Sequence, residues 1–161
     1  YELVCGLEKN NQIEKIYIIG EITINLEDSE INNIYKLKKT RLLGKVNNQI
    51  VKNYIKKSTF IIHLNYGDPC PNFLSEVISY GMPVIINEIG GSKEIVLDAC
   101  LKPRNSVSFD GNHMPKIKNI ISSVIEMINN YKFYKSNAEK ISNNVTFEKY
   151  ISSHIDIISN L

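Results

Sequence analysis

The chain has 161 residues, of which 43% are hydrophobic and 22% charged, a composition typical of one globular domain with a substantial core. A formal net charge of +2 is too small to indicate a nucleic-acid partner or a polybasic membrane patch. Cys5, Cys70 and Cys100 are far apart and form no CxxC pair, so they indicate neither a disulfide framework nor a zinc site. No apolar run approaches the roughly 18 residues of a membrane span, so we expect a cytoplasmic protein, with peripheral attachment to a membrane as the alternative.

Residues 1–59 alternate between helical and extended patterns. Leu3, Val4 and Leu7 share one face of a helix predicted over residues 1–9. Apolar spacing predicts strands at 16–20 and 41–46, and helices at 27–37 and around 50–55.

The stretch 60–94 organises the chain, because it contains two successive strand-loop-helix units. Residues 60–64 (FIIHL) and 83–86 (PVII) are short apolar runs, the pattern of strands buried on both faces. The helix between them is predicted to begin at Asn72, its N-cap, and to end at Gly81.

A second corner follows the second of these strands. Gly90 and Gly91 predict a turn there, and residues 92–99 have a helical pattern. Two strand-to-helix corners side by side form an anion-binding crevice at the carboxyl edge of a parallel sheet.

The remaining chain adds weaker signals. Residues 106–109 are the candidate for the last strand, and amphipathic helices are predicted over 116–129 and 147–161. With five strands alternating with helices, we predict an α/β fold, a parallel Rossmann-like sheet with helices on both faces.

The spacing of polar and small residues in this stretch resembles a known motif. Asp68 and Glu76 are separated by seven residues, and YGMPV at 80–84 and GGSKE at 90–94 follow. This combination resembles the donor-binding motif of GT-B glycosyltransferases of the large retaining family (family 4-like, glycosyl transferases group 1). The resemblance continues weakly from about Ile13 to the C-terminus and implies the C-terminal, donor-binding half of a GT-B fold.

The resemblance also implies roles for single residues. Asp68 is expected against the transferred sugar, as the catalytic-site acid, and Glu76 against the nucleotide ribose, because carboxylate oxygens accept hydrogen bonds from vicinal hydroxyls. The donor would further be held by backbone groups at the helix start and at the glycine turns, namely Cys70, Asn72, Phe73, Leu74, Gly90, Gly91 and Gly44. The motif requires no metal and no cofactor besides the donor itself, a UDP- or GDP-sugar.

Each of these residues also has an ordinary structural interpretation. Glu76 is an acid near a helix N-terminus, where the dipole favours it, and Asp68 is a common turn residue ahead of proline. The glycine turn alone could reflect a need for positive φ. Where the family usually has Gly-Phe-Gly, this chain has residues 69–72 (PCPN), which leaves the donor sugar open.

Three other side chains near the motif are weaker candidates. His63 ends a predicted strand and is more often a core histidine than a site residue. Cys70 has no nearby arrangement that would activate a nucleophile, and Lys93 could reach a phosphate or be solvated.

We therefore expect the donor half of a nucleotide-sugar glycosyltransferase of carbohydrate biosynthesis, acting with retention on a glycan or lipid-linked acceptor. The alternative is a non-catalytic nucleotide-sugar-binding or interaction domain of the same fold; an epimerase of the same architecture is less favoured. In the family an Arg and a Lys that grip the pyrophosphate belong, by spacing, upstream of Tyr1, as does the acceptor domain. Residues 1–161 are thus expected to be an N-terminally incomplete domain, inactive alone, whose helix 147–161 packs partly on the missing domain.

Overall fold

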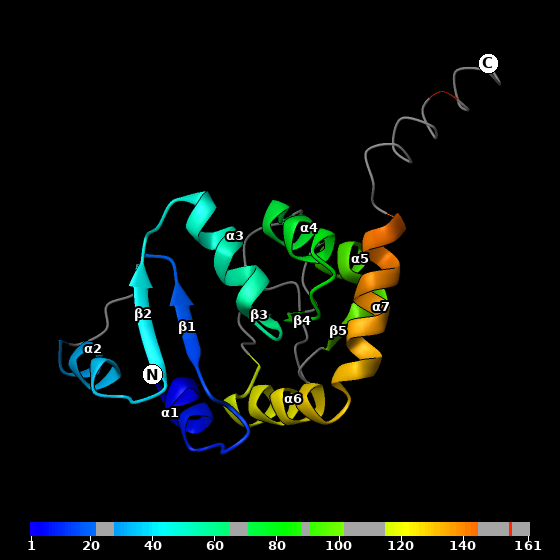
Figure 1. The fold of residues 1–161 in the computed structure, drawn as a ribbon. Coiled ribbons are helices and arrows are strands. Elements are labelled where there is room, and N and C mark those ends of the chain that lie inside the picture. The colour runs from blue at the N-terminus through cyan, green and yellow to red at the C-terminus, as the bar shows by residue number, and fades with distance from the viewer. Residues whose placement is uncertain (22–27, 65–70, 88–90, 102–114, 145–154, 156–161) are drawn as a thin grey trace.

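Short apolar strands alternate with helices along the chain, and each pairing between the described strands is parallel. A computed structural model describes residues 1–21, 28–64, 71–87, 91–101, 115–144 and 155. The strands in these ranges are β1 (Ile16–Ile19), β2 (Thr40–Gly44), β3 (Ile61–His63), β4 (Val84–Ile86) and β5 (Cys100–Leu101). β1 pairs with β2, while β3, β4 and β5 form a second ladder in that order (Figure 1).

Helices cover both faces of these strands. In the described ranges they are α1 (Glu2–Glu8), α2 (Asp28–Tyr35), α3 (Asn48–Lys57), α4 (Asn72–Ser79), α5 (Ser92–Val96), α6 (Ile117–Asn129) and α7 (Tyr131–Asn144), and the 3-10 turn η1 (Leu97–Ala99) follows α5. The predicted fold class, an α/β fold with a parallel Rossmann-like sheet and helices on both faces, is confirmed.

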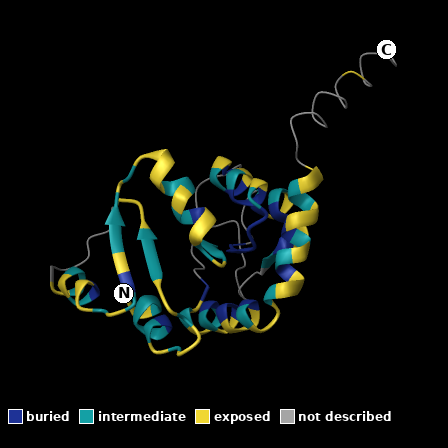
Figure 2. Ribbon diagram, viewed as in Figure 1, coloured by how far each residue is buried: buried dark blue, intermediate teal, exposed yellow. Residues whose placement is uncertain are grey.

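The core is divided into two layers by the alternation of side chains along β4. Val84 and Ile86 pack with buried residues of α3, α4 and α5, whereas Ile85 packs with α1 and α6 on the opposite face. All three side chains are fully buried, and each such burial stabilises the fold by about 1.5–3 kcal/mol. Figure 2 shows the buried residues concentrated on β4 and on the helix faces turned toward it.

The end of α4 is set by a glycine in the left-handed region. Gly81 has φ of +62°, and its N–H donates to the carbonyl of Ile78 at 2.7 Å. The N–H of Met82 donates to the carbonyl of Val77 at 3.3 Å, so the two bonds form a Schellman motif. The predicted helix end at Gly81 is confirmed.

The predicted beginning of α4 is wrong by one residue. Pro71 is the N-cap and Asn72 is the first helical residue, and no side chain caps this end. Proline suits this position because it has no N–H that would need a partner. The segment 92–99 is also less regular than expected, since α5 ends at Val96 and Leu97, the first residue of η1, has φ of 44°.

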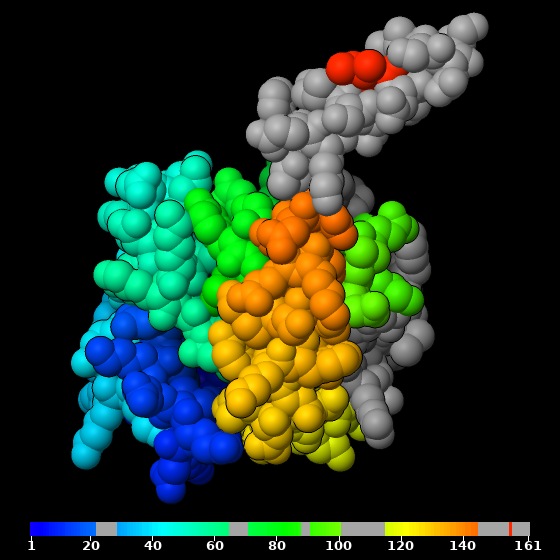
Figure 3. Space-filling view, turned by 45° about the vertical axis from the view of Figure 1, so that its right-hand side comes forward, coloured from blue at the N-terminus to red at the C-terminus, as the bar shows by residue number. Residues whose placement is uncertain are grey.

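Two elements were not predicted from the sequence. β5 is two residues long and pairs with β4, and the candidate strand 106–109 lies outside the described residues. α7 follows α6 after one residue and buries only Tyr134 and Ala138. Figure 3 shows α7 lying between α4 on one side and α5 with η1 on the other. Of the predicted helix 147–161, the structure describes only Ile155.

Candidate functional site

The candidate site lies at the carboxyl ends of the strands, where β3 leads toward α4 and β4 toward α5. Glycines with positive φ stand where β1 and β2 end: Gly20, directly after β1, has φ of 127°, and Gly44, the last residue of β2, has φ of 65°. A Cβ atom on either glycine would meet no other atom within 4 Å, so the backbone is open there. Gly44 therefore satisfies one condition for close approach of a ligand, an uncovered turn at this edge.

Backbone amides at the start of α4 differ in what they already bind. The N–H of Leu74 donates to the carbonyl of Pro71 at 2.9 Å, and the Leu74 side chain is fully buried. The Leu74 amide is thus engaged within the first turn of α4, and its predicted contact with the donor stays a prediction. The amides of Asn72 and Phe73 have no acceptor within α4 or the other described residues.

Glu76 lies on the side of α4 that is turned toward α3. Phe73, Glu76 and Tyr80 follow one another at spacings of three and four, so they share one side of the helix. The Phe73 ring lies 5.2 Å from the His63 ring at the end of β3, and Lys56 of α3 lies 5.0 Å from the centre of the Tyr80 ring. The Glu76 side chain is half-buried between these two contacts.

The carboxylate of Glu76 makes no hydrogen bond or ion pair with any other described residue. The acceptor oxygens of this half-buried carboxylate are therefore not used by the residues that the structure describes. The Glu76 carbonyl accepts a hydrogen bond from the Ser79 hydroxyl at 2.7 Å, which belongs to the helix and leaves the carboxylate untouched.

Two polar side chains, one buried and one half-buried, stand at the ends of β4 and β3. Asn87 directly follows β4 and is only 2% exposed, and His63 is half-buried with its Nε2 atom inside. The contact with Phe73 favours the structural interpretation of His63. Asn87 was not singled out from the sequence, although its signal was present: a polar residue directly after an apolar strand at a carboxyl edge.

Gly91 is the N-cap of α5 and has φ of −81°, a conformation open to any residue. Its identity as glycine is thus not explained by a need for positive φ. Lys93 and Glu94 are exposed in the first turn of α5, which packs against α4. Asp68, Cys70 and Gly90 lie outside the described residues, so the predicted meeting of Asp68, Glu76 and the glycine turn in one crevice stays a prediction.

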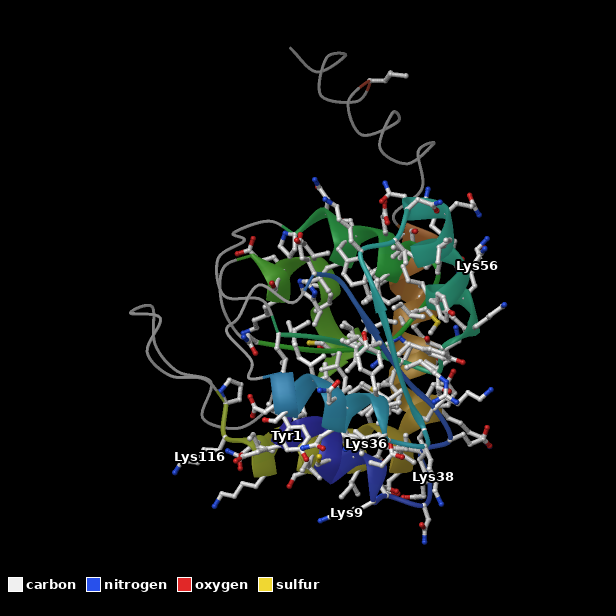
Figure 4. The ribbon with its side chains drawn as sticks, turned by 90° about the vertical axis from the view of Figure 1, so that its left-hand side faces the viewer. Tyr1, Lys9, Lys36, Lys38, Lys56 and Lys116 are labelled. Atoms are coloured by element: carbon white, nitrogen blue, oxygen red, sulfur yellow. The ribbon has the colours of Figure 1, made fainter. Side chains whose placement is uncertain are left out.

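The positive charges labelled in Figure 4 lie mainly away from this edge. Lys36 and Lys38 precede β2, and with Lys9 they lie at the amino end of the strands. Within the described ranges no group of His, Cys, Asp and Glu could hold a metal ion. None of the helices described combines the length and apolar character of a membrane span.

The parallel strands, the helices on both faces and the uncapped start of α4 define a Rossmann-like α/β domain with its open edge at the strands' carboxyl ends. The profile of a family described as "Glycosyl transferases group 1" matches residues 4–130, and the chain belongs to that family. This membership agrees with the motif resemblance and supports a role in glycosyl transfer. No curated protein matches the chain.

Proposed function

We propose that the chain is the donor-binding part of a retaining glycosyltransferase that takes its sugar from a nucleoside diphosphate sugar. The observation that carries the proposal is the half-buried Glu76 carboxylate, which has no partner among the described residues and stands beside an uncapped helix start. Its place in α4 matches the motif position that the family uses for the nucleotide ribose.

Glu76 is the proposed ribose ligand. The two oxygens of a carboxylate can accept hydrogen bonds from both hydroxyls of a vicinal diol, and charge-assisted bonds of this kind are about twice as strong as neutral ones. Because Glu76 is turned toward α3, the ribose would lie between α4 and the turn after Gly44, where the backbone is open.

The diphosphate is proposed to lie at the start of α4. The amides of Asn72 and Phe73 are the described donors there, and the helix dipole adds a partial positive charge. α4 has eight residues, so its dipole is developed over two turns. Asp68 remains the proposed contact to the transferred sugar.

In this proposal the domain contributes positioning and electrostatic stabilisation of the leaving diphosphate. An acceptor hydroxyl, on a glycan or a lipid-linked sugar, would attack from a second domain, so residues 1–161 alone would bind the nucleotide weakly and transfer nothing. Sugar transfer by the 161-residue chain would contradict this two-domain mechanism.

Calorimetric titration with UDP and GDP, using Glu76→Gln and Glu139→Gln, tests the ribose contact. Glu139 is a matched control because it lies on α7, is 57% exposed and, among the described residues, pairs only with Lys135, at 3.4 Å. A hydrogen bond to a charged group contributes about 1.5–3 kcal/mol, so Glu76→Gln should weaken binding of the preferred nucleotide by about 10- to 150-fold. Glu139→Gln should bind like the wild type.

Equal affinities of the two variants would contradict the role of Glu76. Nucleotide binding without sugar transfer by the complete polypeptide would instead favour the alternative, a non-catalytic nucleotide-sugar-binding domain. If UDP and GDP each bind to Glu76→Gln as tightly as to the wild type, the nucleotide is recognised through its phosphates alone.

A further inference from the structure

The last four carbonyls of α4 all have hydrogen-bond partners, whereas no side chain caps the start of this helix. A helix cannot pair its last four carbonyls internally, so they need other donors. The carbonyl of Glu76 accepts from the Ser79 hydroxyl at 2.7 Å, and the Schellman motif occupies the carbonyls of Val77 and Ile78. The carbonyl of Ser79 is bonded from outside the helix.

Two side chains of α7 complete this end of α4. The hydroxyl of Ser142 donates to the carbonyl of Ser79 at 2.8 Å, and Nζ of Lys135 donates to the carbonyl of Gly81 at 2.7 Å. The partners are 63 and 54 positions apart in the sequence, so both bonds depend on the tertiary structure. The Lys135 cation also offsets the partial negative charge at the carboxyl end of a helix.

α7 has one face that fits the end of α4. Lys135, Ala138 and Ser142 follow one another at spacings of three and four, so they share this face. Ala138 is fully buried in the cluster that holds the buried side chains of α4. A Cβ atom on Gly81 would lie 3.5 Å from Cα of Glu139, so the backbone of α7 passes directly against the turn that ends α4.

α7 holds the neighbouring helix at a similar place. Nδ2 of Asn137 donates to the carbonyl of Asp98 at 3.1 Å, in the turn η1 that follows α5. α5 packs against α4, and α7 lies between α4 on one side and α5 with η1 on the other (Figure 3). Both helices begin at the carboxyl edge of the strands, so α7 bonds to the ends of α4 and α5 that are far from the candidate site.

The two ends of α4 are mechanically linked. The helix has eight residues and is therefore about 12 Å long. A helix this short moves as a rigid rod, so a tilt at Ser79 displaces the amides of Asn72 and Phe73 and the carboxylate of Glu76. The start of α4 has no side-chain cap that could hold it in place.

We propose that Lys135 and Ser142 are positioning residues of the donor site, which fix the carboxyl end of α4 and thereby the direction in which its start and Glu76 face the nucleotide. Neither side chain touches the nucleotide. When the Lys135 bond is lost, α4 samples several orientations, and the apparent affinity falls in proportion to the fraction that remains competent. The effect on nucleotide binding rests on the proposed function, whereas the anchoring of α4 does not.

Three variants separate the parts of this anchor. Lys135→Met keeps the length of the apolar stem but removes the charge and the donor, whereas Lys135→Arg keeps both. Glu139→Gln is the control, because it removes the ion pair with Lys135 at 3.4 Å and leaves the bond between Lys135 and Gly81 in place.

Amide hydrogen exchange without nucleotide measures the anchoring. The test compares the amides of Val77 and Ile78 inside α4 with those of Val124 and Met127 inside α6. In Lys135→Met the α4 amides should exchange at least about tenfold faster relative to the α6 amides than in the wild type. Lys135→Arg and Glu139→Gln should keep the wild-type ratio.

Calorimetric titration with UDP and GDP measures the consequence for the site, at a temperature where all variants are folded. Lys135→Met should bind the preferred nucleotide about tenfold more weakly, as expected if one α4 orientation in ten is competent. Lys135→Arg should restore the affinity. Ser142→Ala should weaken binding less than Lys135→Met, because its bond to Ser79 is between neutral groups.

Four results would overturn the proposal. Equal acceleration of exchange in α4 and α6 would show that Lys135 stabilises the whole fold and does not anchor α4 in particular. Unchanged nucleotide affinity in Lys135→Met, with α4 loosened, would show that the anchor does not position the site. Exchange and binding of Lys135→Arg that match those of Lys135→Met would exclude a role of the cation. If the wild type binds neither nucleotide, the proposed function and the positioning role both fail, while the exchange ratio still decides whether α7 anchors α4.

Discussion

Replacing Gly81 by alanine tests how α4, the helix that carries Glu76, is held in place. Gly81 has φ of +62°, and an L-residue in this region costs about 1–2 kcal/mol. The new Cβ would lie 3.1 Å from Cγ of Glu139, a side chain with an exposed end that can move slightly. We therefore expect the free energy of unfolding to fall by about 1–2 kcal/mol, and Tm by roughly 2–8 °C in a chain of this length.

Urea and thermal unfolding followed by circular dichroism would measure this change. Gly91→Ala is the matched control, because Gly91 has φ of −81°, which alanine adopts without strain. The free energy of unfolding of Gly91→Ala should stay the same or rise by up to about 1 kcal/mol. Equal losses in the two variants, or no loss in Gly81→Ala, would refute the assignment of strain to Gly81.

Three further predictions concern the supports of the fold. The pKa of the Glu8 carboxyl is lowered, because desolvation, which raises it, is outweighed by hydrogen bonds from the Lys39 N–H and the Thr40 hydroxyl. The wild type should therefore be more stable than Glu8→Gln in urea unfolding above the ordinary pKa of 4.5. This advantage should vanish as the pH falls through the lowered pKa. Asn47→Ala removes the side-chain cap that accepts from the Ile50 N–H at 3.0 Å, and should cost about 1 kcal/mol in urea unfolding, whereas Asn53→Ala within the same helix should cost less. Burial, with the nearby Glu126 charge, raises the pKa of Tyr134 to about 12. In a spectroscopic pH titration, Tyr134→Phe should therefore show the same phenolate absorbance as the wild type in the ordinary tyrosine range near pH 10. A smaller absorbance of the variant in that range would show that Tyr134 titrates normally.

The strands that the sequence predicted well are those with continuous apolar runs. β1, β3 and β4 lie within one residue of the predicted bounds, because a short and almost continuous apolar run marks each of them in the sequence, although only β4 is fully buried. β5 was missed because two residues carry no periodicity. α7 was missed because Tyr134 and Ala138 are its only fully covered residues, too few to form a visible apolar stripe.

The candidate site could be predicted in part. The position of Glu76 and the end of α4 follow from residue types at fixed spacing, and the structure agrees with the helix they imply. The engagement of the Leu74 amide could not be predicted, since it depends on how tightly the first turn closes after Pro71. The two-ladder sheet is likewise a tertiary feature, visible only once both helix layers are in place.

The most direct test of the proposed donor site is an NMR titration of the protein with UDP-glucose and GDP-mannose as probes. The account predicts saturable shifts of the amides of Asn72, Phe73, Gly44 and Gly91, all at the carboxyl edge, with one of the two nucleotides preferred. Shifts confined to the amino end of the strands, around Lys9, Lys36 and Lys38, and equal for both nucleotides, would contradict it, because they would show only nonspecific attraction of phosphate to lysines.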